Sequence, residues 1–219
     1  MKLFIDSGNL RDIQAMVPLG IIDGVTTNPS LMAKEGGDPR QIIKTICDAV
    51  QGPVSAEVVA TDFEGMVAEG RELAKIDTHV VVKIPFTRDG VRATHVLASE
   101  GHRVNVTLIF SPTQALLAAK VGAAYVSPFV GRLDDIATDG MELIRQIVDI
   151  FDQFEFATEV LVASVRSPMH IVQAARMGAD VCTCPVSVID ACFNHPLTDI
   201  GLAKYLKDWE KAQAAAAKA

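Results

Sequence analysis

The sequence is poor in aromatic residues and contains no long apolar run. Aromatic side chains make up 5% of the 219 residues, whereas hydrophobic residues as a whole make up 49%. With many alanines and valines, this composition is typical of α/β proteins with buried parallel strands. No stretch reaches the roughly 18 consecutive apolar residues of a transmembrane helix, so we expect no membrane-spanning segment. The first residues, MKLFID, enter a predicted strand without a signal-peptide pattern, which predicts a cytoplasmic protein.

Motifs for nucleotides and metals are also missing. The chain has neither a GxxxxGKS/T phosphate loop nor a GxGxxG fingerprint, so we expect no nucleotide cofactor. Cys182 and Cys184 share one face of a predicted strand, but no second cysteine pair or histidine cluster completes a metal site. We therefore expect structural thiols in a reducing compartment, and no metal. The net charge of −7 argues against non-specific binding to nucleic acid or anionic membranes, although a local basic pocket could hold a small phosphate.

Eight short β-like runs alternate with helical patterns along the whole chain. Their first residues lie roughly 22 to 34 positions apart, the length of one strand with its following helix. The runs are residues 2–6, 24–28, 54–59, 80–84, 103–109, 125–130, 159–165 and 181–186. This alternation predicts parallel strands with helices outside, and eight units predict a single (β/α)8 TIM barrel over residues 1–219. A doubly wound open sheet is the alternative architecture.

Cap residues support these boundaries. Asp38-Pro39, Ser111-Pro112 and Ser167-Pro168 each place a helix-capping side chain before a proline that suits the first helical position. Several helical patterns end at a glycine that precedes the next strand, namely Gly101, Gly122 and Gly178.

An extra helix is predicted after the eighth strand, over residues 196–211. Its apolar face includes Ile200, Leu206 and Trp209. Because a barrel does not need this helix, we expect it to cover the barrel bottom or to pack on a neighbouring subunit.

A lysine stands inside the most apolar of these runs. Lys83 lies in VVVKIP (80–85), where β-branched residues indicate a buried strand. Burial favours the neutral form of an amine, and a neutral lysine is the nucleophile that forms Schiff bases with carbonyl substrates. The alternative is a lysine that reaches out from the strand end or pairs with a buried carboxylate.

Polar side chains recur at the predicted carboxyl ends of the strands, where barrel enzymes place their active residues. They are Asp6, Thr26, Thr27, Asn28, Glu57, Lys83, Asn105, Thr107, Ser127, Arg132, Ser164 and Arg166. Taken singly, each has a structural explanation: Asp6 could cap a helix, and Glu57 could neutralise Lys83. Because charged groups in adjacent buried strands cost several kcal/mol, the set as a whole indicates function. Thr183 and Ser187, from the eighth unit, receive no role.

The charged members of this set predict Schiff-base chemistry on a ketone. Lys83 attacks the carbonyl and forms a carbinolamine and then an imine, which accepts electrons while the neighbouring C–C bond breaks or forms. Glu57 and Thr107 move the protons of the dehydration step, directly or through a water molecule. Asp6 is the candidate base on the substrate hydroxyl.

A second group predicts a phosphate site. Arg132 and Arg166 follow strand ends and could clamp a phosphate through paired hydrogen bonds. Ser127 and Ser164 could add hydroxyl donors.

Four ordered motifs resemble those of transaldolases: GVTTNPS (24–30), VKIP (82–85), NVTLIFS (105–111) and SPFVGR (127–132). The resemblance is to the small subfamily that includes fructose-6-phosphate aldolases, and it covers nearly the whole chain. It implies a class I, metal-free barrel of the pentose phosphate pathway. Such an enzyme transfers a dihydroxyacetone unit from sedoheptulose 7-phosphate or fructose 6-phosphate to glyceraldehyde 3-phosphate or erythrose 4-phosphate.

The resemblance also implies a role for each site residue. Lys83 would be the imine nucleophile and Asp6 the acid and base on the cleaved hydroxyl, while Glu57 and Thr107 would handle the water. The substrate-binding residues would be Asn28, Asn105, Ser127, Phe129, Arg132, Ser164 and Arg166, the last three around the phosphate. Small members of the family typically form pentamers or decamers in which the C-terminal helix reaches a neighbour, which predicts a homo-oligomer without a cofactor.

Two positions separate the two activities of this subfamily. The aldolases carry glutamine where this chain has Glu57 and tyrosine where it has Phe129, so the resemblance favours a transaldolase. A fructose-6-phosphate aldolase or related class I aldolase is the first alternative. A non-catalytic sugar-phosphate-binding barrel is the second.

Overall fold

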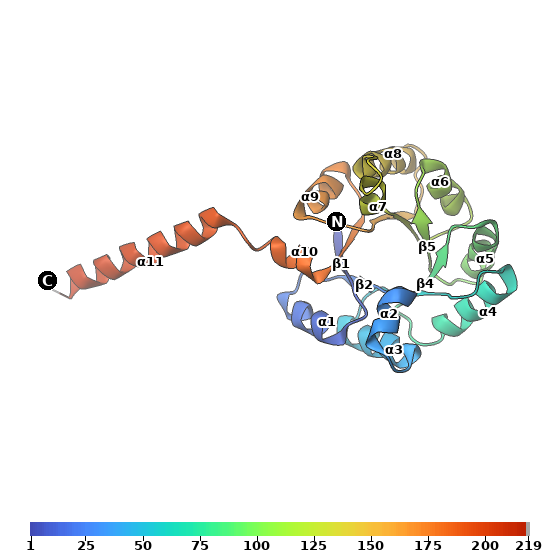
Figure 1. Ribbon diagram of the computed structural model, residues 1–219, viewed down its shortest axis with the longest axis horizontal. Coiled ribbons are helices and arrows are strands. Elements are labelled where there is room, and N and C mark those ends of the chain that lie inside the picture. The colour runs from blue at the N-terminus through green and yellow to red at the C-terminus, as the bar shows by residue number, and fades with distance from the viewer. Residues whose placement is uncertain (218–219) are drawn as a thin grey trace.

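The computed structural model describes residues 1–217 and shows a closed barrel of eight parallel strands surrounded by helices (Figure 1). The strands are β1 (Lys2–Asp6), β2 (Gly24–Thr26), β3 (Val54–Glu57), β4 (Val80–Pro85), β5 (Val104–Ile109), β6 (Tyr125–Pro128), β7 (Glu159–Val162) and β8 (Val181–Cys184). Each strand pairs in parallel with the next, and β8 pairs with β1. The predicted (β/α)8 barrel is therefore confirmed, and the open sheet is excluded.

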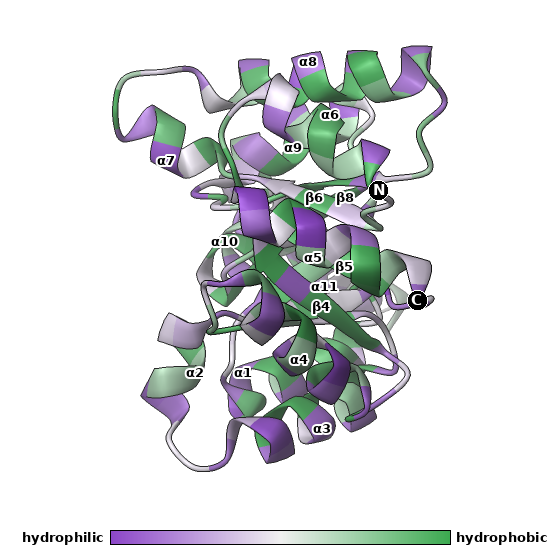
Figure 2. Cartoon of the chain, turned by 90° about the vertical axis from the view of Figure 1, so that its right-hand side faces the viewer, coloured by the Kyte–Doolittle hydropathy of each residue, from purple (hydrophilic) through white to green (hydrophobic). Residues whose placement is uncertain are grey.

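Helices follow the strands around the outside of the barrel. They are α1 (Leu10–Met16), the 3-10 helix η1 (Val17–Leu19), α2 (Pro29–Glu35), α3 (Pro39–Val50), α4 (Phe63–Ala74), α5 (Arg88–Ser99), α6 (Pro112–Lys120), α7 (Val130–Asp134), α8 (Gly140–Gln153), α9 (Pro168–Met177), α10 (Val186–Ala191) and α11 (Pro196–Ala216). Figure 2 shows hydrophilic and hydrophobic residues alternating along helices such as α3 and α8, whereas β4 is mainly hydrophobic. This is the pattern of helices that bury one side against a sheet.

The core consists of two separate layers because successive side chains on a strand point to opposite faces. A large outer layer between the strands and the helices includes Val82, Ile84 and Leu97. A small inner cluster fills the barrel itself with Phe4, Val81, Tyr125, Leu161, Ala163 and Val181. Toward the carboxyl ends of the strands, the inward-facing positions become polar, as at Asp6, Lys83 and Ser127.

The predicted caps are present at most helix ends. The side chain of Asp38 accepts a hydrogen bond from the Arg40 N–H, and Ser111 accepts one from the Gln114 N–H. Ser167 precedes α9 as predicted but makes no capping hydrogen bond through its side chain. The predicted terminal glycines adopt the left-handed conformation, which glycine reaches without steric penalty, with φ of 86° at Gly101, 88° at Gly122 and 83° at Gly178.

Several strands end earlier than predicted because the next helix begins at once. The predicted strand 24–28 stops at Thr26, and Asn28 instead caps α2 by accepting a hydrogen bond from the Leu31 N–H at 2.9 Å. The predicted strand 125–130 stops at Pro128, after which Phe129 keeps a single bridge to Ala163. Each early stop places a candidate site residue in the loop above the barrel.

Helix α11 extends beyond the predicted 196–211 to Ala216, as the alanine-rich end continues the helix. It projects away from the barrel in Figure 1, and none of its side chains is buried. Its apolar side chains Leu197, Ile200, Leu206 and Trp209 are 56–70% exposed. In this structure α11 therefore does not cover the barrel bottom. Among residues 1–217, no helix combines the length and hydropathy needed to cross a membrane.

Candidate active site

A cavity of about 190 Å³ opens at the carboxyl ends of the strands. Its lining residues are Asp6, Thr26, Asn28, Lys83, Ser127, Phe129, Arg132, Ala163, Ser164, Arg166 and Thr183. Most of the predicted site residues thus meet in one place, although they come from distant parts of the chain. Asn105 and Thr107 lie within the adjacent barrel wall, and Glu57 lies at the end of β3.

Lys83 is almost fully enclosed, with 5% of its surface exposed. It stands beside Glu57 in the β3–β4 ladder, and its Nζ lies 3.0 Å from Glu57 Oε2. The same Nζ donates a hydrogen bond to the Thr27 carbonyl oxygen at 3.0 Å. The buried carboxylate partner that we considered for this lysine is therefore present. The same partner is close enough to accept the proton that a nucleophilic amine must lose.

Glu57 faces a second cavity as well. This larger space, about 610 Å³, lies among α2, α3 and α4 and includes Met32, Ile43 and Leu73 in its wall. Glu57 thus connects the amine of Lys83 with a space on the other side of the strand ends.

Asp6 lines the opposite side of the smaller cavity, at the end of β1. Its Oδ1 accepts a hydrogen bond from Thr26 Oγ1 at 2.8 Å, and Thr26 Oγ1 lies 2.7 Å from Thr183 Oγ1. Burial raises the pKa of the Asp6 carboxyl above its ordinary value, while the Thr26 hydrogen bond and the charge of Lys83 oppose this shift only in part. Asp6 does not cap the next helix, because Asn9 does so.

Asn105 is held by two neighbours inside the barrel wall. Its Nδ2 donates to Ser55 Oγ at 3.1 Å, and its Oδ1 accepts from Ser127 Oγ at 2.7 Å. All three side chains are buried. These two hydrogen bonds fix the orientation of the Asn105 amide, which would not be fixed without them.

Thr107 carries a buried hydroxyl that has no hydrogen-bond partner among residues 1–217. The next residue, Leu108, has φ of 59°, and the β5–β6 ladder shifts its register between Val106 and Ile109. A bulge of this kind re-aims side chains and is common beside active sites. A buried hydroxyl without a partner costs about 1–3 kcal/mol, so a hydrogen bond to a bound molecule would stabilise this position.

The two arginines lie at the rim of the cavity. Arg132, from α7, stacks over the Phe129 ring with 5.6 Å between guanidinium carbon and ring centroid. Arg166 pairs with Asp135 at 2.9 Å. Both guanidinium groups are exposed and can reach an anion at the cavity mouth.

A close backbone contact joins the β6 and β7 sides of this rim. The Gly131 N–H donates to the Ser164 carbonyl oxygen at 3.0 Å, and Ser164 has φ of 59°. A Cβ at position 131 would lie 2.2 Å from that oxygen, so only glycine fits there. This contact sets the spacing between Arg132 and Arg166.

Sequence reasoning missed three polar residues of this site or assigned them no role. Thr26 and Thr183 complete the contacts of Asp6, and Ser55 completes those of Asn105. The signal for Ser55 was its two-residue spacing from Glu57, which puts both side chains on one face of β3. Contacts between different strands carry no comparable signal, because they depend on the register of the barrel.

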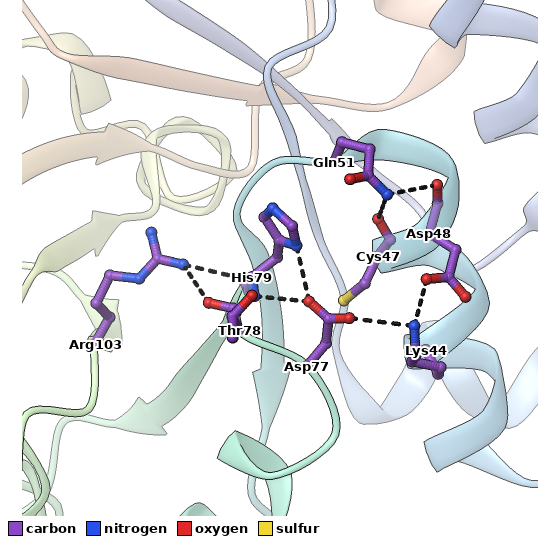
Figure 3. Close-up of polar contacts among 8 residues, drawn as sticks. All are labelled: Lys44, Cys47, Asp48, Gln51, Asp77, Thr78, His79 and Arg103. Atoms are coloured by element: carbon purple, nitrogen blue, oxygen red, sulfur yellow. Dashed lines mark hydrogen bonds and ion pairs between the residues drawn. The ribbon is translucent and has the colours of Figure 1, made fainter.

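Other titratable clusters lie away from this cavity. At the amino ends of the strands, a network of ion pairs joins α3 to the loop before β4 (Figure 3). It consists of Lys44 and Asp48 from α3 and of Asp77 and His79 from the loop. Cys182 and Cys184 lie in the outer core layer with 3.6 Å between their sulfur atoms. No group of three or more His, Cys, Asp or Glu side chains within residues 1–217 is arranged to hold a metal ion.

The family of this chain follows from comparisons of its sequence with known proteins. The sequence profile of the Transaldolase/Fructose-6-phosphate aldolase family matches residues 3–219. The chain belongs to the transaldolase/fructose-6-phosphate aldolase family. Within that family it is 58% identical to a probable transaldolase from Syntrophobacter fumaroxidans, over 97% of this chain and 98% of the relative. It is also 58% identical to probable transaldolases from Methanococcus maripaludis strain S2, over 96% and 98%, and from Thermodesulfovibrio yellowstonii, over 96% and 99%.

Family membership covers the complete barrel, because the match begins in β1 and continues beyond β8. The resemblance seen in four sequence motifs is therefore confirmed at the level of the family. Those motifs of the transaldolase/fructose-6-phosphate aldolase family correspond to the carboxyl ends of β2, β4, β5 and β6, the strands around the cavity.

Proposed function

We propose that this protein is a transaldolase that transfers a dihydroxyacetone unit from a ketose phosphate to an aldose phosphate. The main support is the Lys83 amine, enclosed in the barrel 3.0 Å from the Glu57 carboxylate and sharing a cavity with Asp6. Relatives that are 58% identical along nearly their whole length carry the name probable transaldolase. Sedoheptulose 7-phosphate or fructose 6-phosphate would be the donor, as in the pentose phosphate pathway.

The reaction begins when Lys83 forms an imine with the donor ketone. Glu57 accepts the proton of the ammonium, and the amine then adds to the carbonyl carbon to give a carbinolamine. Glu57 returns the proton to the carbinolamine hydroxyl, which leaves as water and gives the iminium. The Thr107 hydroxyl, unpartnered among residues 1–217, supports this step because it is available to bind that water.

Asp6 then drives the exchange of the aldose. Its carboxylate takes the proton from the donor's C4 hydroxyl, the C3–C4 bond breaks, and its electron pair moves to the iminium to give an enamine. The enamine adds to the acceptor aldehyde, and Asp6 returns the proton to the new alkoxide. Water finally hydrolyses the product imine. The raised pKa of Asp6 suits a group that must both take and return a proton.

The remaining residues hold the substrate. Asn28 and Ser127, which line the cavity, bind hydroxyls near the imine, and Asn105 holds Ser127 through its hydrogen bond. Arg132, Ser164 and Arg166 line the rim and bind the phosphate there, and Arg166 exchanges part of its contact with Asp135 for the phosphate.

Phe129 favours transfer over simple cleavage. It lines the cavity and has no hydroxyl that could protonate the enamine. The enamine therefore waits for an acceptor aldehyde instead of leaving as free dihydroxyacetone. Phe129→Tyr is expected to raise the ratio of aldolase to transferase activity, measured as product formed without and with an added aldose phosphate. An unchanged ratio would contradict this role and would keep the aldolase alternative open.

Borohydride trapping tests the central proposal. With fructose 6-phosphate present, reduction is expected to attach a dihydroxyacetone-derived mass irreversibly to Lys83, located by peptide mapping. Lys44, a partly exposed lysine in an ion pair, is the internal control and is expected to remain unmodified. No addition at Lys83 would favour the non-catalytic sugar-phosphate-binding barrel.

We also propose that the chain works as a homo-oligomer, a pentamer or decamer, in which α11 packs on a neighbouring subunit. The support is the apolar face of α11, which no part of the described chain covers. Light scattering coupled to size exclusion is expected to show the oligomer for the full chain and smaller species for Leu206→Glu combined with Trp209→Glu. Equal masses would refute the role of α11.

A further inference from the structure

A short chain of polar side chains runs across three strands beside the cavity. Thr183 on β8, Thr26 on β2 and Asp6 on β1 follow one another at 2.7 Å and 2.8 Å. Both threonines are about 2% exposed, so these contacts are shielded from bulk water. We propose that Thr183 is a positioning residue that donates its hydroxyl proton to Thr26 and thereby holds the Thr26 hydroxyl on Asp6.

The count of protons fixes the direction of this chain. A threonine hydroxyl has one proton to donate and lone pairs that accept. Thr26 gives its proton to Asp6, because an ionised carboxylate can only accept. The contact between Thr26 and Thr183 therefore requires Thr183 to be the donor. Such a chain strengthens each of its bonds, since a hydroxyl that accepts one hydrogen bond donates a stronger one.

The barrel register brings these groups together. β1 lies between β2 and β8, with Asp6 opposite Thr26 in one ladder and Phe4 opposite Thr183 in the other. The Thr183 side chain thus lies below Asp6, level with Phe4 of the small inner cluster. A hydroxyl at that level has few possible acceptors, and this favours a specific contact with Thr26.

Asp6 is surrounded by several charged or titratable groups from other strands. Lys83 faces it across the cavity from β4, with Glu57 of β3 beyond that lysine. Arg132 and Arg166 stand at the rim on the β6 and β7 sides, and the Cys184 thiol lies on the outer face of β8, opposite to the Thr183 side chain. Thr183 has no charge, so its effect on Asp6 passes through Thr26 rather than through space.

This role gives Thr183 a defined consequence for the reaction, and it rests on the proposed function of Asp6. The Thr26 hydrogen bond stabilises the ionised form of Asp6 and occupies Oδ1, which leaves Oδ2 for the substrate hydroxyl. Loss of the Thr183 hydroxyl weakens that bond and raises the pKa of Asp6. Less of the base form is then available on the acid side of the pH profile.

Thr183→Val removes the hydroxyl and keeps the side-chain shape. We expect C–C cleavage, measured as single-turnover release of the aldose phosphate, to fall about three- to ten-fold. We expect the acid limb of the pH profile of this cleavage rate to move to higher pH by about half a unit. Thr183→Ser is expected to restore both values. A Thr183→Val acid limb that coincides with the wild-type limb would overturn the proposal.

Further variants separate positioning from a general packing effect. Thr94→Val removes another buried hydroxyl, in α5, which donates to the Gly90 carbonyl at 2.8 Å, and is expected to leave the acid limb unchanged. If Thr183 acts through Thr26, the double variant Thr26→Val with Thr183→Val will match Thr26→Val alone. Additive shifts would show that Thr183 acts by another route. If Thr183→Val does not fold, Thr183→Ala offers the same comparison with a smaller side chain.

A spectroscopic measurement keeps this inference separate from the proposed function. Infrared titration of the Asp6 carboxyl, with Asp6→Asn used to assign the band, is expected to show a higher pKa in Thr183→Val without any substrate. An absent shift overturns the role of Thr183 even when Lys83 is trapped by borohydride. A shift without trapping at Lys83 supports the hydroxyl chain and refutes the proposed reaction.

Discussion

The two ends of the barrel each contain a lysine paired with a carboxylate, yet the two surroundings differ. At the amino ends of the strands, Lys44 binds Asp48 and Asp77, and Asp77 also accepts hydrogen bonds from the backbone and ring of His79 (Figure 3). At the carboxyl ends, Lys83 has one carboxylate and one carbonyl as partners, and a buried Thr107 hydroxyl nearby in β5 has no partner within the described chain.

The pKa shifts of the acids at the two ends run in opposite directions. The His79 backbone hydrogen bond, followed by bonds from the His79 ring and Lys44, lowers the pKa of Asp77 to about 2. Burial raises the pKa of Asp6 instead. A carboxylate with many donors stays ionised and stabilises the fold, whereas one with few donors can exchange a proton. The comparison indicates that incomplete hydrogen bonding, rather than the presence of a lysine and an acid, distinguishes the end with the proposed active site.

The largest difference is expected from the same substitution at each lysine. Lys83→Arg keeps a cation beside Glu57 but removes the nucleophile, so transfer activity is expected to fall by a factor on the order of 10³ or more. Lys44→Arg keeps its ion pairs and is expected to retain activity within about two-fold. Steady-state transfer assays with both variants test this. Comparable activities for the two would remove the distinction between the ends.

Asp6→Asn is expected to lower C–C cleavage by about 10²- to 10³-fold, because the amide cannot take the hydroxyl proton. Imine formation depends on Lys83 and Glu57, so borohydride trapping of the variant is expected to continue. Rapid-quench assays of aldose release and mass spectrometry of the trapped enzyme measure the two steps. A parallel loss of trapping would assign Asp6 to imine formation instead.

Thr107→Val sharpens the comparison by separating stability from activity. Since the hydroxyl is buried without a partner, the free energy of unfolding is expected to stay the same or rise by up to about 1 kcal/mol. Activity is expected to fall about ten-fold, because the water of the dehydration step loses its binding group. Urea unfolding and transfer assays provide both numbers. Thr94→Val, whose hydroxyl is bonded, should show the reverse, with lower stability and full activity.

Asp77→Ala is expected to have the smallest effect on activity and a clear effect on stability. Loss of its donors should lower the free energy of unfolding by about 1–2 kcal/mol at neutral pH, with activity unchanged. Because folding lowers the pKa of Asp77 from 3.8 to about 2, its contribution is complete above pH 3.8 and disappears as the pH falls toward 2. Unfolding of both proteins across this range tests the sign. A stability difference as large at pH 2 as at neutral pH would contradict it.

The sequence predicts the barrel and the charged part of the site well, for physical reasons. Helical caps such as Asp38 and the terminal glycines are local signals, and the two-residue alternation in β5 places Asn105 and Thr107 on one face. Lys83 stands out because an apolar strand around a lysine has few structural explanations. Each of these inferences depends only on residues that lie close together in the sequence.

The remaining features depend on contacts between distant strands. The pairing of Thr26 with Thr183 follows from the barrel register, and the left-handed Leu108 follows from the bulge between β5 and β6. Likewise, Arg166 pairs with Asp135 because the backbone hydrogen bond between Gly131 and Ser164 joins the β6 and β7 sides of the rim. The roles of the site residues stay predictions that the experiments above test.

The small inner cluster, which includes Phe4, Val81, Tyr125, Leu161 and Val181, has a consequence for the kinetics. It fills the barrel axis beneath Lys83, so the proposed active-site cavity is closed on that side and does not run through the barrel. In the proposed reaction, the first aldose product must then leave through the same opening before the acceptor aldose can enter. Under the proposed reaction, initial-rate plots against donor at several acceptor concentrations should give the parallel lines of a double-displacement enzyme, and excess acceptor should compete with the donor for entry.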